Sequence, residues 1–420
     1  MNSDTKKILI LCNDFPPINS IGAERPYSWH LYFREFGLDP VVITKNWTTN
    51  GNNPFNQVGK HSLVEKTNEG VIIRAKSYLT PSHYFYRLFG KRLSFFRKGL
   101  TFIEKILAFQ FSFLDQHISI YNEARRYIKA NKIDLIITTG EPFLLFKYGY
   151  LLKKEFNIKW IADYRDGWSL NHVRSVKKDI LNSFIWRNEF KFEKKYTKTA
   201  DLITTVDPDL ARKIEHLTNN KVEVVYNGFW EYYENKIGSR KKAKLVFNHT
   251  GTLTIGQRLE FLLDTIVELK NENQITEKDF RLNLIGLEYF PDQMLRLQPY
   301  KKSIGEFIHT TPRLPKNEAV AMNLEADYLV NFTDENYSAI YAKTYDYIAC
   351  QKPILVIPGD GNLLDEMITT KKIGYILNSK EELINFIKQP DTTTNVFSKD
   401  DFFKRKTQTG ILSKVIHELI

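Results

Sequence analysis

Residues 8–26 read I-L-I-L-C-N-D-F-P-P-I-N-S-I-G-A-E-R-P, a stretch that combines a strand, a loop and the start of a helix. Ile8 to Leu11 form a continuous apolar run, which is typical of a strand buried on both faces of a parallel sheet. Two prolines stiffen the loop, and Gly22 and Ala23 open the helix. A glycine there lets backbone amides approach an anion, although an ordinary helix start explains the stretch equally well. The stretch predicts the first strand and helix of an α/β domain.

Short apolar runs and longer amphipathic segments alternate along the rest of the chain, which predicts the α/β fold class with doubly wound parallel sheets. The strands predicted in the first half are Ile8–Cys12, Pro40–Thr44, Val71–Ala75, Asp134–Thr138, Ile158–Ala162, Leu202–Thr205 and Val222–Val225. Those in the second half are Lys244–His249, Leu282–Ile285, Phe307–His309, Tyr328–Asn331, Pro353–Ile357 and Gly374–Leu377. Helix-length segments include Ala23–Phe36, Ile118–Asn131 and Glu141–Glu155.

The chain has 420 residues, more than one hydrophobic core usually supports, so two domains are expected. We expect an N-terminal domain at 1–228, a polar linker at 229–243 and a C-terminal domain at 244–400. The helical pattern at 401–420 is expected to pack back toward the N-terminal domain. Tandem α/β sheets bind ligands outside the carboxyl ends of their strands, so the two crevices can face each other.

The net charge of +11 favours anionic partners, namely nucleic acid, an acidic membrane surface or phosphorylated ligands. Two isolated cysteines, Cys12 and Cys350, suggest neither a disulfide framework nor a zinc cluster and fit a reducing compartment. The sequence shows no signal peptide and no membrane-spanning apolar run. These features predict a soluble cytoplasmic protein.

Polar clusters follow two consecutive predicted strands. I-T-T-G-E-P-F (137–143) contains Glu141, and I-A-D-Y-R-D-G-W (161–168) contains Asp163, Arg165 and Asp166. The ends of parallel strands share one edge of a sheet, so these residues would line a binding site. Alternatively, Arg165 and Asp166 form a structural ion pair.

Two stretches of the second half could bind a phosphorylated ligand. N-H-T-G-T-L-T-I-G-Q-R (248–258) places a glycine-threonine loop between a strand and a helix, with Arg258 as a counter-charge to a diphosphate. A plain strand-to-helix turn fits as well. In A-K-T-Y-D-Y (342–347), Lys343, Asp346 and Tyr347 share one helix face. Lys343 would meet phosphate and Asp346 would accept hydrogen bonds from ribose, or the two form a surface ion pair.

Together these stretches resemble glycosyltransferase family 4 over roughly residues 6 to 380. The resemblance is carried by P-P-I-N-S-I-G-A-E-R, I-T-T-G-E-P-F, W-I-A-D-Y-R-D-G-W, V-Y-N-G-F, H-T-G-T-L and A-K-T-Y-D-Y-I-A-C-Q-K-P-I-L, which occur in the expected order. It implies a GT-B fold with two Rossmann-like domains facing a cleft. It also implies a retaining, hexosyltransferase-type enzyme that needs no metal and no cofactor, with a nucleoside-diphosphate sugar such as a UDP- or GDP-sugar as donor.

The resemblance also implies roles for individual residues. Asp163 would contact the transferred sugar and, with Arg258 and Lys343, form the catalytic set. The donor-binding set is Gly22, Gly251, Thr252, Arg313, Ser338, Asp346 and Tyr347, and the acceptor-side set is Glu141, Arg165 and Asp166. Ser338 stands where the family's E-x7-E motif has its first acid, which departs from the pattern. The D-Y-R-D-x-W variant is similar to members that build bacterial surface polysaccharides, such as capsule or O-antigen, from lipid-linked intermediates.

The segment 84–111 combines helically spaced apolar residues with a basic face made of Arg87, Lys91, Arg92, Arg97 and Lys98. Such a segment can lie in an anionic membrane interface, which predicts peripheral attachment at the inner face of the cytoplasmic membrane. The alternative is a core helix pair with a solvated basic face.

Two other functions compete with sugar transfer. One is an inactive GT-B scaffold in a polysaccharide assembly complex, and the other is nucleic-acid binding, which no motif supports.

Overall fold

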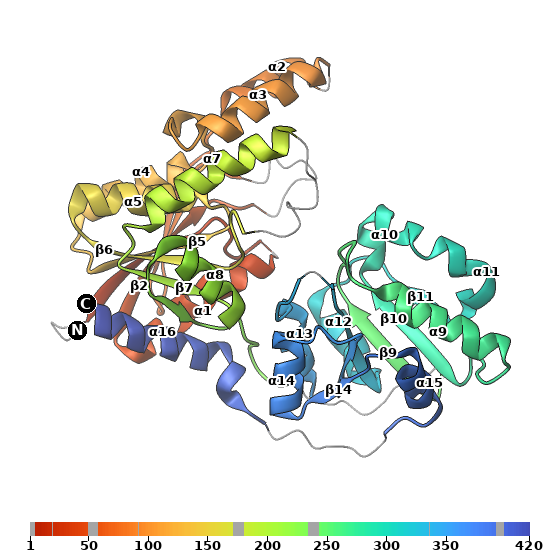
Figure 1. The fold of residues 1–420 in the computed structure, drawn as a ribbon. Coiled ribbons are helices and arrows are strands. Elements are labelled where there is room, and N and C mark those ends of the chain that lie inside the picture. Colours follow the sequence, from red (N-terminus) through yellow and green to blue (C-terminus); the bar gives the residue numbers. More distant parts are fainter. Residues whose placement is uncertain are drawn as a thin grey trace. The chain divides into compact units, whose positions relative to one another are not determined.

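The structure is a computed structural model that describes residues 5–18, 20–48, 58–90, 92–170, 180–233, 243–335, 337–391 and 399–420. The chain forms two compact units. Unit 1 consists of Met1–Asn227 with Arg405–Ile420, and unit 2 is Gly228–Lys404. Each unit has a largely parallel sheet with helices on both faces (Figure 1), so the predicted α/β fold class is confirmed.

The unit 1 sheet has the strand order β3-β4-β2-β1-β5-β6-β7-β8. Its strands are β1 (Lys6–Leu11), β2 (Leu38–Lys45), β3 (Leu63–Lys66), β4 (Val71–Ala75), β5 (Leu135–Gly140), β6 (Lys159–Tyr164), β7 (Leu202–Thr205) and β8 (Val222–Val224). All pair in parallel except β3, which runs antiparallel to β4. The sequence did not reveal β3 because this four-residue edge strand is largely exposed and carries no buried apolar run.

Helices cover both faces of this sheet. They are α1 (Ile21–Tyr32), α2 (Pro81–Phe89), α3 (Ser94–Leu107), α4 (Ile118–Ala130), α5 (Leu144–Phe156), α7 (Ile180–Thr197), α8 (Pro208–Thr218) and α16 (Arg405–Leu419), with the 3-10 turns η1 (Phe33–Phe36) and η3 (Ser112–Leu114). Trp29 of α1 and Leu412 and Ile416 of α16 belong to one core cluster with Ile8 and Ile10. Residues of α4, α5, α7 and α8 form the core on the opposite face.

The unit 2 sheet is parallel throughout, in the order β11-β10-β9-β12-β13-β14. Its strands are β9 (Leu245–Thr250), β10 (Phe280–Ile285), β11 (Ile308–Thr310), β12 (Tyr328–Phe332), β13 (Ile354–Ile357) and β14 (Gly374–Ile376). Its helices are α9 (Leu259–Asn271), α10 (Pro291–Leu295), α11 (Lys301–Ile304), α12 (Lys316–Glu325), α13 (Ala342–Cys350), α14 (Leu363–Lys371) and α15 (Lys380–Lys388). The 3-10 turns are η4 (Leu287–Tyr289), η5 (Gln298–Tyr300), η6 (Gly305–Phe307) and η7 (Asp401–Phe403). Core clusters lie on both faces, with α9 and α15 on one and α12, α13 and α14 on the other.

The predicted linker is not a free segment at its start. Gly228–Tyr233 belongs to unit 2, where the Phe229 amide donates to Phe403 O (2.9 Å) and the Tyr233 amide to Ala349 O (2.9 Å). Residues 234–242 of the predicted linker lie outside the described residues. The C-terminal helix begins at Arg405, four residues later than the sequence pattern suggested, because η7 and Lys404 belong to unit 2.

Within the parts of the chain that the structure describes, no helix combines the length and apolar character needed to cross a membrane.

Candidate functional site

The carboxyl edge of the unit 2 sheet holds a buried histidine beneath a lysine. His249 lies at the end of β9 and has no exposed surface. Its Nδ1 lies 2.9 Å from Val330 O. Because a carbonyl only accepts, Nδ1 carries the proton, and Nε2 is left to accept from Lys343 Nζ at 3.0 Å. His249 therefore positions the ammonium group of Lys343.

Lys343 lies in the first turn of α13 and also donates to Thr252 O at 3.3 Å. Neither of these contacts neutralises its charge. Desolvation by the surrounding protein lowers the pKa of Lys343 to about 7. Burial, together with the charge of Lys343, moves the pKa of His249 well below its usual value, so the imidazole is neutral at neutral pH. An uncompensated lysine at a helix N-terminus is suited to an anion such as phosphate.

Arg258 and Gly251 lie at the same edge. The Arg258 guanidinium contacts Glu335 (2.9 Å), Thr333 Oγ1 (3.1 Å) and Gly359 O (3.2 Å), which fixes it above the ends of β12 and β13. Gly251 directly follows β9 and has φ of +93°, a conformation that favours glycine. Thr252 beside it is exposed. These positions agree with a loop that cradles a charged ligand.

Ser338 and Asp360 form a hydrogen-bonded pair where α14 begins. Ser338 Oγ donates to Asp360 Oδ2 at 2.7 Å. The same carboxylate accepts the amides of Asn362 (2.9 Å), Asp365 (3.1 Å) and Leu364 (3.2 Å). A carboxylate thus lies next to the serine, but its oxygens are occupied in capping the helix.

The remaining residues predicted to bind the donor differ in the solvent exposure of their side chains. Asp346 is partly exposed and pairs with Lys316 of α12 at 3.2 Å, so the Lys343–Asp346 surface pair is not the arrangement observed. Tyr347 is fully buried, its hydroxyl accepting from Thr250 N (2.8 Å) and donating to Val330 O (3.4 Å). We therefore assign Tyr347 to holding the end of β9 and not to donor binding, because its hydroxyl bonds Thr250, the last residue of that strand. Arg313 is exposed and lies over the ring of Tyr289, 5.4 Å from its centroid.

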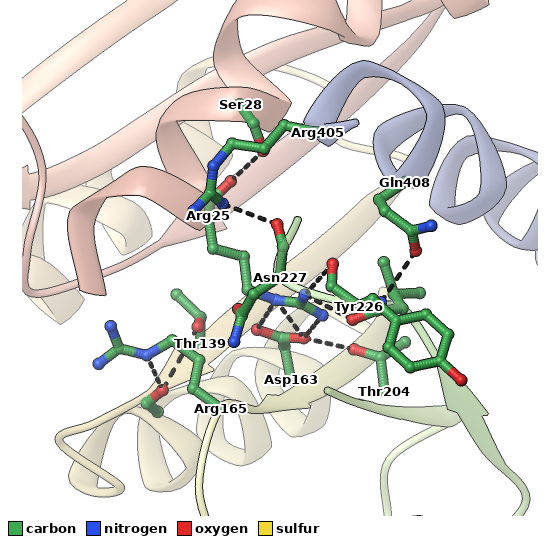
Figure 2. A network of polar contacts seen from close by, with 12 residues as sticks. Arg25, Ser28, Thr139, Asp163, Arg165, Thr204, Tyr226, Asn227, Arg405 and Gln408 are labelled. Carbon is green, nitrogen blue, oxygen red and sulfur yellow. Dashed lines mark hydrogen bonds and ion pairs between the residues drawn. The ribbon is translucent and has the colours of Figure 1, made fainter. Parts of the chain in front are cut away.

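In unit 1, Asp163 is the last residue but one of β6 and lies in a buried network shown in Figure 2. Arg25 of α1 binds its carboxylate through Nη2 (2.7 Å) and Nε (3.1 Å), and Thr204 Oγ1 donates to it at 2.7 Å. Arg25 Nη1 also donates to Val225 O (2.6 Å) and Tyr226 O (3.3 Å). The network joins α1, β6, β7 and the segment after β8.

The expectation that Asp163 contacts the transferred sugar is not met in this arrangement. Its side chain has no exposed surface, and Arg25 and Thr204 donate to its carboxylate. Both oxygens of this carboxylate are engaged, and the ion pair with Arg25 ties α1 to β6, a role that we call a structural anchor. We therefore assign Asp163 to positioning α1 and not to the catalytic set.

Figure 2 also shows Arg165, which approaches α1 from the end of β6. Its Nε donates to Gly140 O and its Nη2 to Glu141 O (2.9 Å), so it is tied to the end of β5. A Cβ on Gly22 would lie 1.8 Å from Arg165 Nη1. A side chain at position 22 would therefore displace the Arg165 guanidinium, which occupies the space beside Gly22 at the N-terminus of α1.

Asp166 and Glu141 are exposed beside Arg165. Desolvation by nearby protein atoms and the negative charge of Glu141 raise the pKa of Asp166 to about 6, although solvent reaches its side chain. A carboxylate with this pKa can take up or release a proton near neutral pH.

The predicted basic face is described except for Lys91, which lies outside the described residues. Arg87, Arg92 and Lys98 are exposed, and Arg97 lies over the ring of Tyr86, 5.7 Å from its centroid. The alternative of a core helix pair is wrong, because no apolar residue of α2 or α3 is buried and many are exposed.

Sequence reasoning missed the partners that hold the site together. His249 lies in the motif N-H-T-G-T-L and Arg25 in P-P-I-N-S-I-G-A-E-R, but no local pattern predicts a role for either residue. Asp360 lies in P-G-D-G-N after β13, a turn-like stretch that gave no signal of its contact with Ser338. Among the described residues, no group of three or more histidine, cysteine, aspartate or glutamate side chains could hold a metal ion.

Comparison with known proteins gives a family match over part of the chain and a fold for the whole chain. Residues 83–229 match the model of the family described as Glycosyltransferase Family 4. Among curated proteins, no sequence matches the chain. Similar solved structures include sucrose-phosphate synthase from Thermosynechococcus elongatus, at 12% identity and TM-score 0.67 over 99% of each chain.

Two further structures are similar at 12% identity. UDP-forming α,α-trehalose-phosphate synthase from Burkholderia xenovorans, in complex with glucose-6-phosphate, has a TM-score of 0.60 over 99% of each chain. The lipopolysaccharide outer core galactosyltransferase WaaB, in its apo form, has a TM-score of 0.54 over 99% of this chain and 100% of that one. The predicted GT-B fold is thereby confirmed.

Proposed function

We propose that this chain, a GT-B protein with a glycosyltransferase family 4 segment, transfers a sugar from a nucleoside-diphosphate sugar to an acceptor hydroxyl. The observation that carries the proposal is the Lys343 ammonium held on neutral His249 at the carboxyl edge of the unit 2 sheet. A diphosphate would supply the negative charge that the contacts of Lys343 lack. The UDP-forming relative supports a nucleotide donor.

In the proposed reaction, the bond between the sugar carbon and the diphosphate oxygen breaks, and a bond to the acceptor oxygen forms. Negative charge then develops on the diphosphate, where Lys343, Arg258 and the amides after Gly251 stabilise it. The acceptor proton passes to the departing phosphate on the same face, which gives a retaining transfer. In this scheme the fixed cations stabilise the leaving group without a metal ion.

We assign acceptor binding to the cluster of Glu141, Arg165 and Asp166 in unit 1. Arg165 supplies a fixed cation, and two exposed carboxylates beside it can accept hydrogen bonds from sugar hydroxyls. The acceptor class that we propose is a lipid-linked glycan intermediate of a surface polysaccharide, such as capsule or O-antigen. The similarity to a lipopolysaccharide galactosyltransferase supports this choice.

The test is calorimetric titration with UDP, GDP, ADP and CMP, followed by turnover with sugars of the base that binds. Lys343→Met should weaken binding of that nucleotide about 10- to 100-fold, as expected for one lost charge-assisted contact. The matched control is Lys301→Met, at an exposed lysine on α11 of the same unit. Equal affinities for wild type and Lys343→Met would contradict the proposed donor site. Binding without turnover of any sugar nucleotide would favour the inactive scaffold.

A further inference from the structure

The helical hairpin formed by α2 and α3 buries polar side chains and exposes apolar ones. In α2 the buried residue is Ser82, and in α3 it is Glu104, both polar. Seven large apolar side chains of the hairpin are exposed instead, among them Phe95 (82% exposed) and Leu88 (76% exposed). The exposed apolar residues of this hairpin are Tyr84, Leu88, Phe89, Leu93, Phe95, Phe96 and Ile103. A soluble surface rarely exposes so many large apolar residues together unless they bind something.

Buried hydrogen bonds hold the hairpin in this orientation. The Glu104 carboxylate accepts Ser82 N (2.6 Å), Ser82 Oγ (2.6 Å) and Thr80 Oγ1 (3.0 Å), all at the N-terminus of α2. Negative charge is favourable there because it meets the free amides of the first turn. Turning the apolar face inward would break these bonds and expose Glu104. The outward orientation is therefore a built feature of unit 1, where α2 and α3 lie side by side (Figure 1).

Neighbouring segments extend this surface. Phe111 and Phe113 follow α3, and Phe184 and Trp186 lie on α7, all with about half of their surface exposed. Asn188 Nδ2 of α7 donates to Ile106 O at 3.1 Å, which fixes α7 against the end of α3. We call these residues, with the exposed apolar residues of the hairpin, the aromatic face.

The charge of the hairpin is of one sign. Between Pro81 and Leu107 the sequence has one acid, the buried Glu104. Its cations are Arg87, Lys91, Arg92, Arg97, Lys98 and Lys105. The outer surface of α2 and α3 therefore combines apolar side chains with positive charge and presents no acidic side chain.

We propose that the aromatic face binds an anionic lipid bilayer, with its ring side chains at the boundary of headgroups and acyl chains and its cations at the lipid phosphates. A 14-residue helix such as α3 is about 21 Å long, shorter than the ~30 Å hydrocarbon core, so the hairpin lies in the membrane plane. A second copy of this chain is disfavoured as the occupant, because two such faces would bring like charges together. The inference does not depend on the proposed reaction.

The test is sedimentation of the full chain with vesicles of phosphatidylcholine alone or with about 30% phosphatidylglycerol. We expect at least tenfold stronger binding to the anionic vesicles, weakened by 0.5 M NaCl. Leu88→Ser with Phe95→Ser should reduce binding at least tenfold. The matched control, Phe290→Ser with Leu295→Ser, changes two exposed apolar residues of unit 2 and should bind like wild type. Equal binding by both double variants would overturn the proposal.

Two further measurements separate lipid contact from self-association of the chain. Arg92→Gln with Lys98→Gln should remove the preference for anionic vesicles, whereas Lys301→Gln with Lys302→Gln should keep it. Phe95→Trp should add fluorescence that shifts to the blue on anionic vesicles and is quenched by brominated lipid. Sedimentation velocity tests for dimers of the chain. If wild type formed concentration-dependent dimers but did not bind vesicles, and the Leu88→Ser, Phe95→Ser variant formed no dimers, the face would bind a second copy. That result would refute the lipid proposal.

Discussion

Asp163→Asn keeps the shape of the side chain but removes the negative charge that Arg25 binds at the end of β6. The two side chains are 0% and 3% exposed and approach to 2.7 Å, so the guanidinium would be left buried beside a neutral amide. Breaking a buried ion pair by changing one partner costs about 3–5 kcal/mol. In domains of about 150–250 residues, 1 kcal/mol shifts Tm by roughly 2–4 °C. The expected fall in the Tm of unit 1 is therefore roughly 10 °C, with a range of about 6–20 °C.

Calorimetric scanning of the full chain measures this shift, and the sheltered position of the pair makes it insensitive to 0.5 M NaCl. The control is Arg126→Gln, which removes an ion pair with Glu123 from the surface of α4, where the arginine is 72% exposed. Such a pair contributes below about 1 kcal/mol, so Tm should change by no more than about 4 °C. If Asp163→Asn melted like wild type while losing turnover, the carboxylate would be contacting substrate, and its assignment as a structural anchor would be refuted.

The remaining predictions concern the donor edge and the start of α1. Above pH 7 apo Lys343 must take up a proton to bind a diphosphate, whose terminal phosphate (pKa about 6) is already ionised. Affinity should thus fall up to tenfold per pH unit, and a Lys343→Met variant showing the same slope would contradict this. Gly22→Ala should displace Arg165 and lower turnover about tenfold or more. The control Gly99→Ala has open space around it and should turn over like wild type, and equal rates for the two variants would refute the packing role of Gly22. Tyr347→Phe should lower stability in urea by about 1–3 kcal/mol with nucleotide affinity retained, and lost affinity would return Tyr347 to the donor site.

The fold was predictable because strands buried on both faces must be apolar throughout. The apolar runs Ile8–Leu11, Leu135–Ile137 and Ile354–Ile357 are visible in the sequence for this reason, and they lie within strands of the structure. The exposed edge strand β3 carries no such constraint. The sequence therefore predicts the buried strands of the two sheets but not an exposed edge strand such as β3.

The candidate site was predictable in part. The sequence indicated which strand ends carry charge, but not which charges meet. Arg25 and Asp163 are 138 residues apart, and Lys343 and His249 are 94 apart, so each pairing exists only once the sheets have formed. The contact between Glu104 and Ser82 could have been suspected from the sequence. Glu104 is the single acid of the basic segment 81–107, and in the structure its buried carboxylate binds the start of α2.

The division of unit 1 into two separated pieces of chain affects how the protein is made. Leu412 and Ile416 of α16 pack against Ile8 and Ile10, although 193 residues separate Asn227 from the C-terminus. At translation rates of ~5–20 residues per second, the part of this core cluster that α16 supplies is missing for roughly 10–40 s. Unit 2, a continuous segment, leaves the ribosome complete in the meantime. The portion synthesised first is therefore the last to be completed, and the apolar residues that contact α16 lack this partner during that interval.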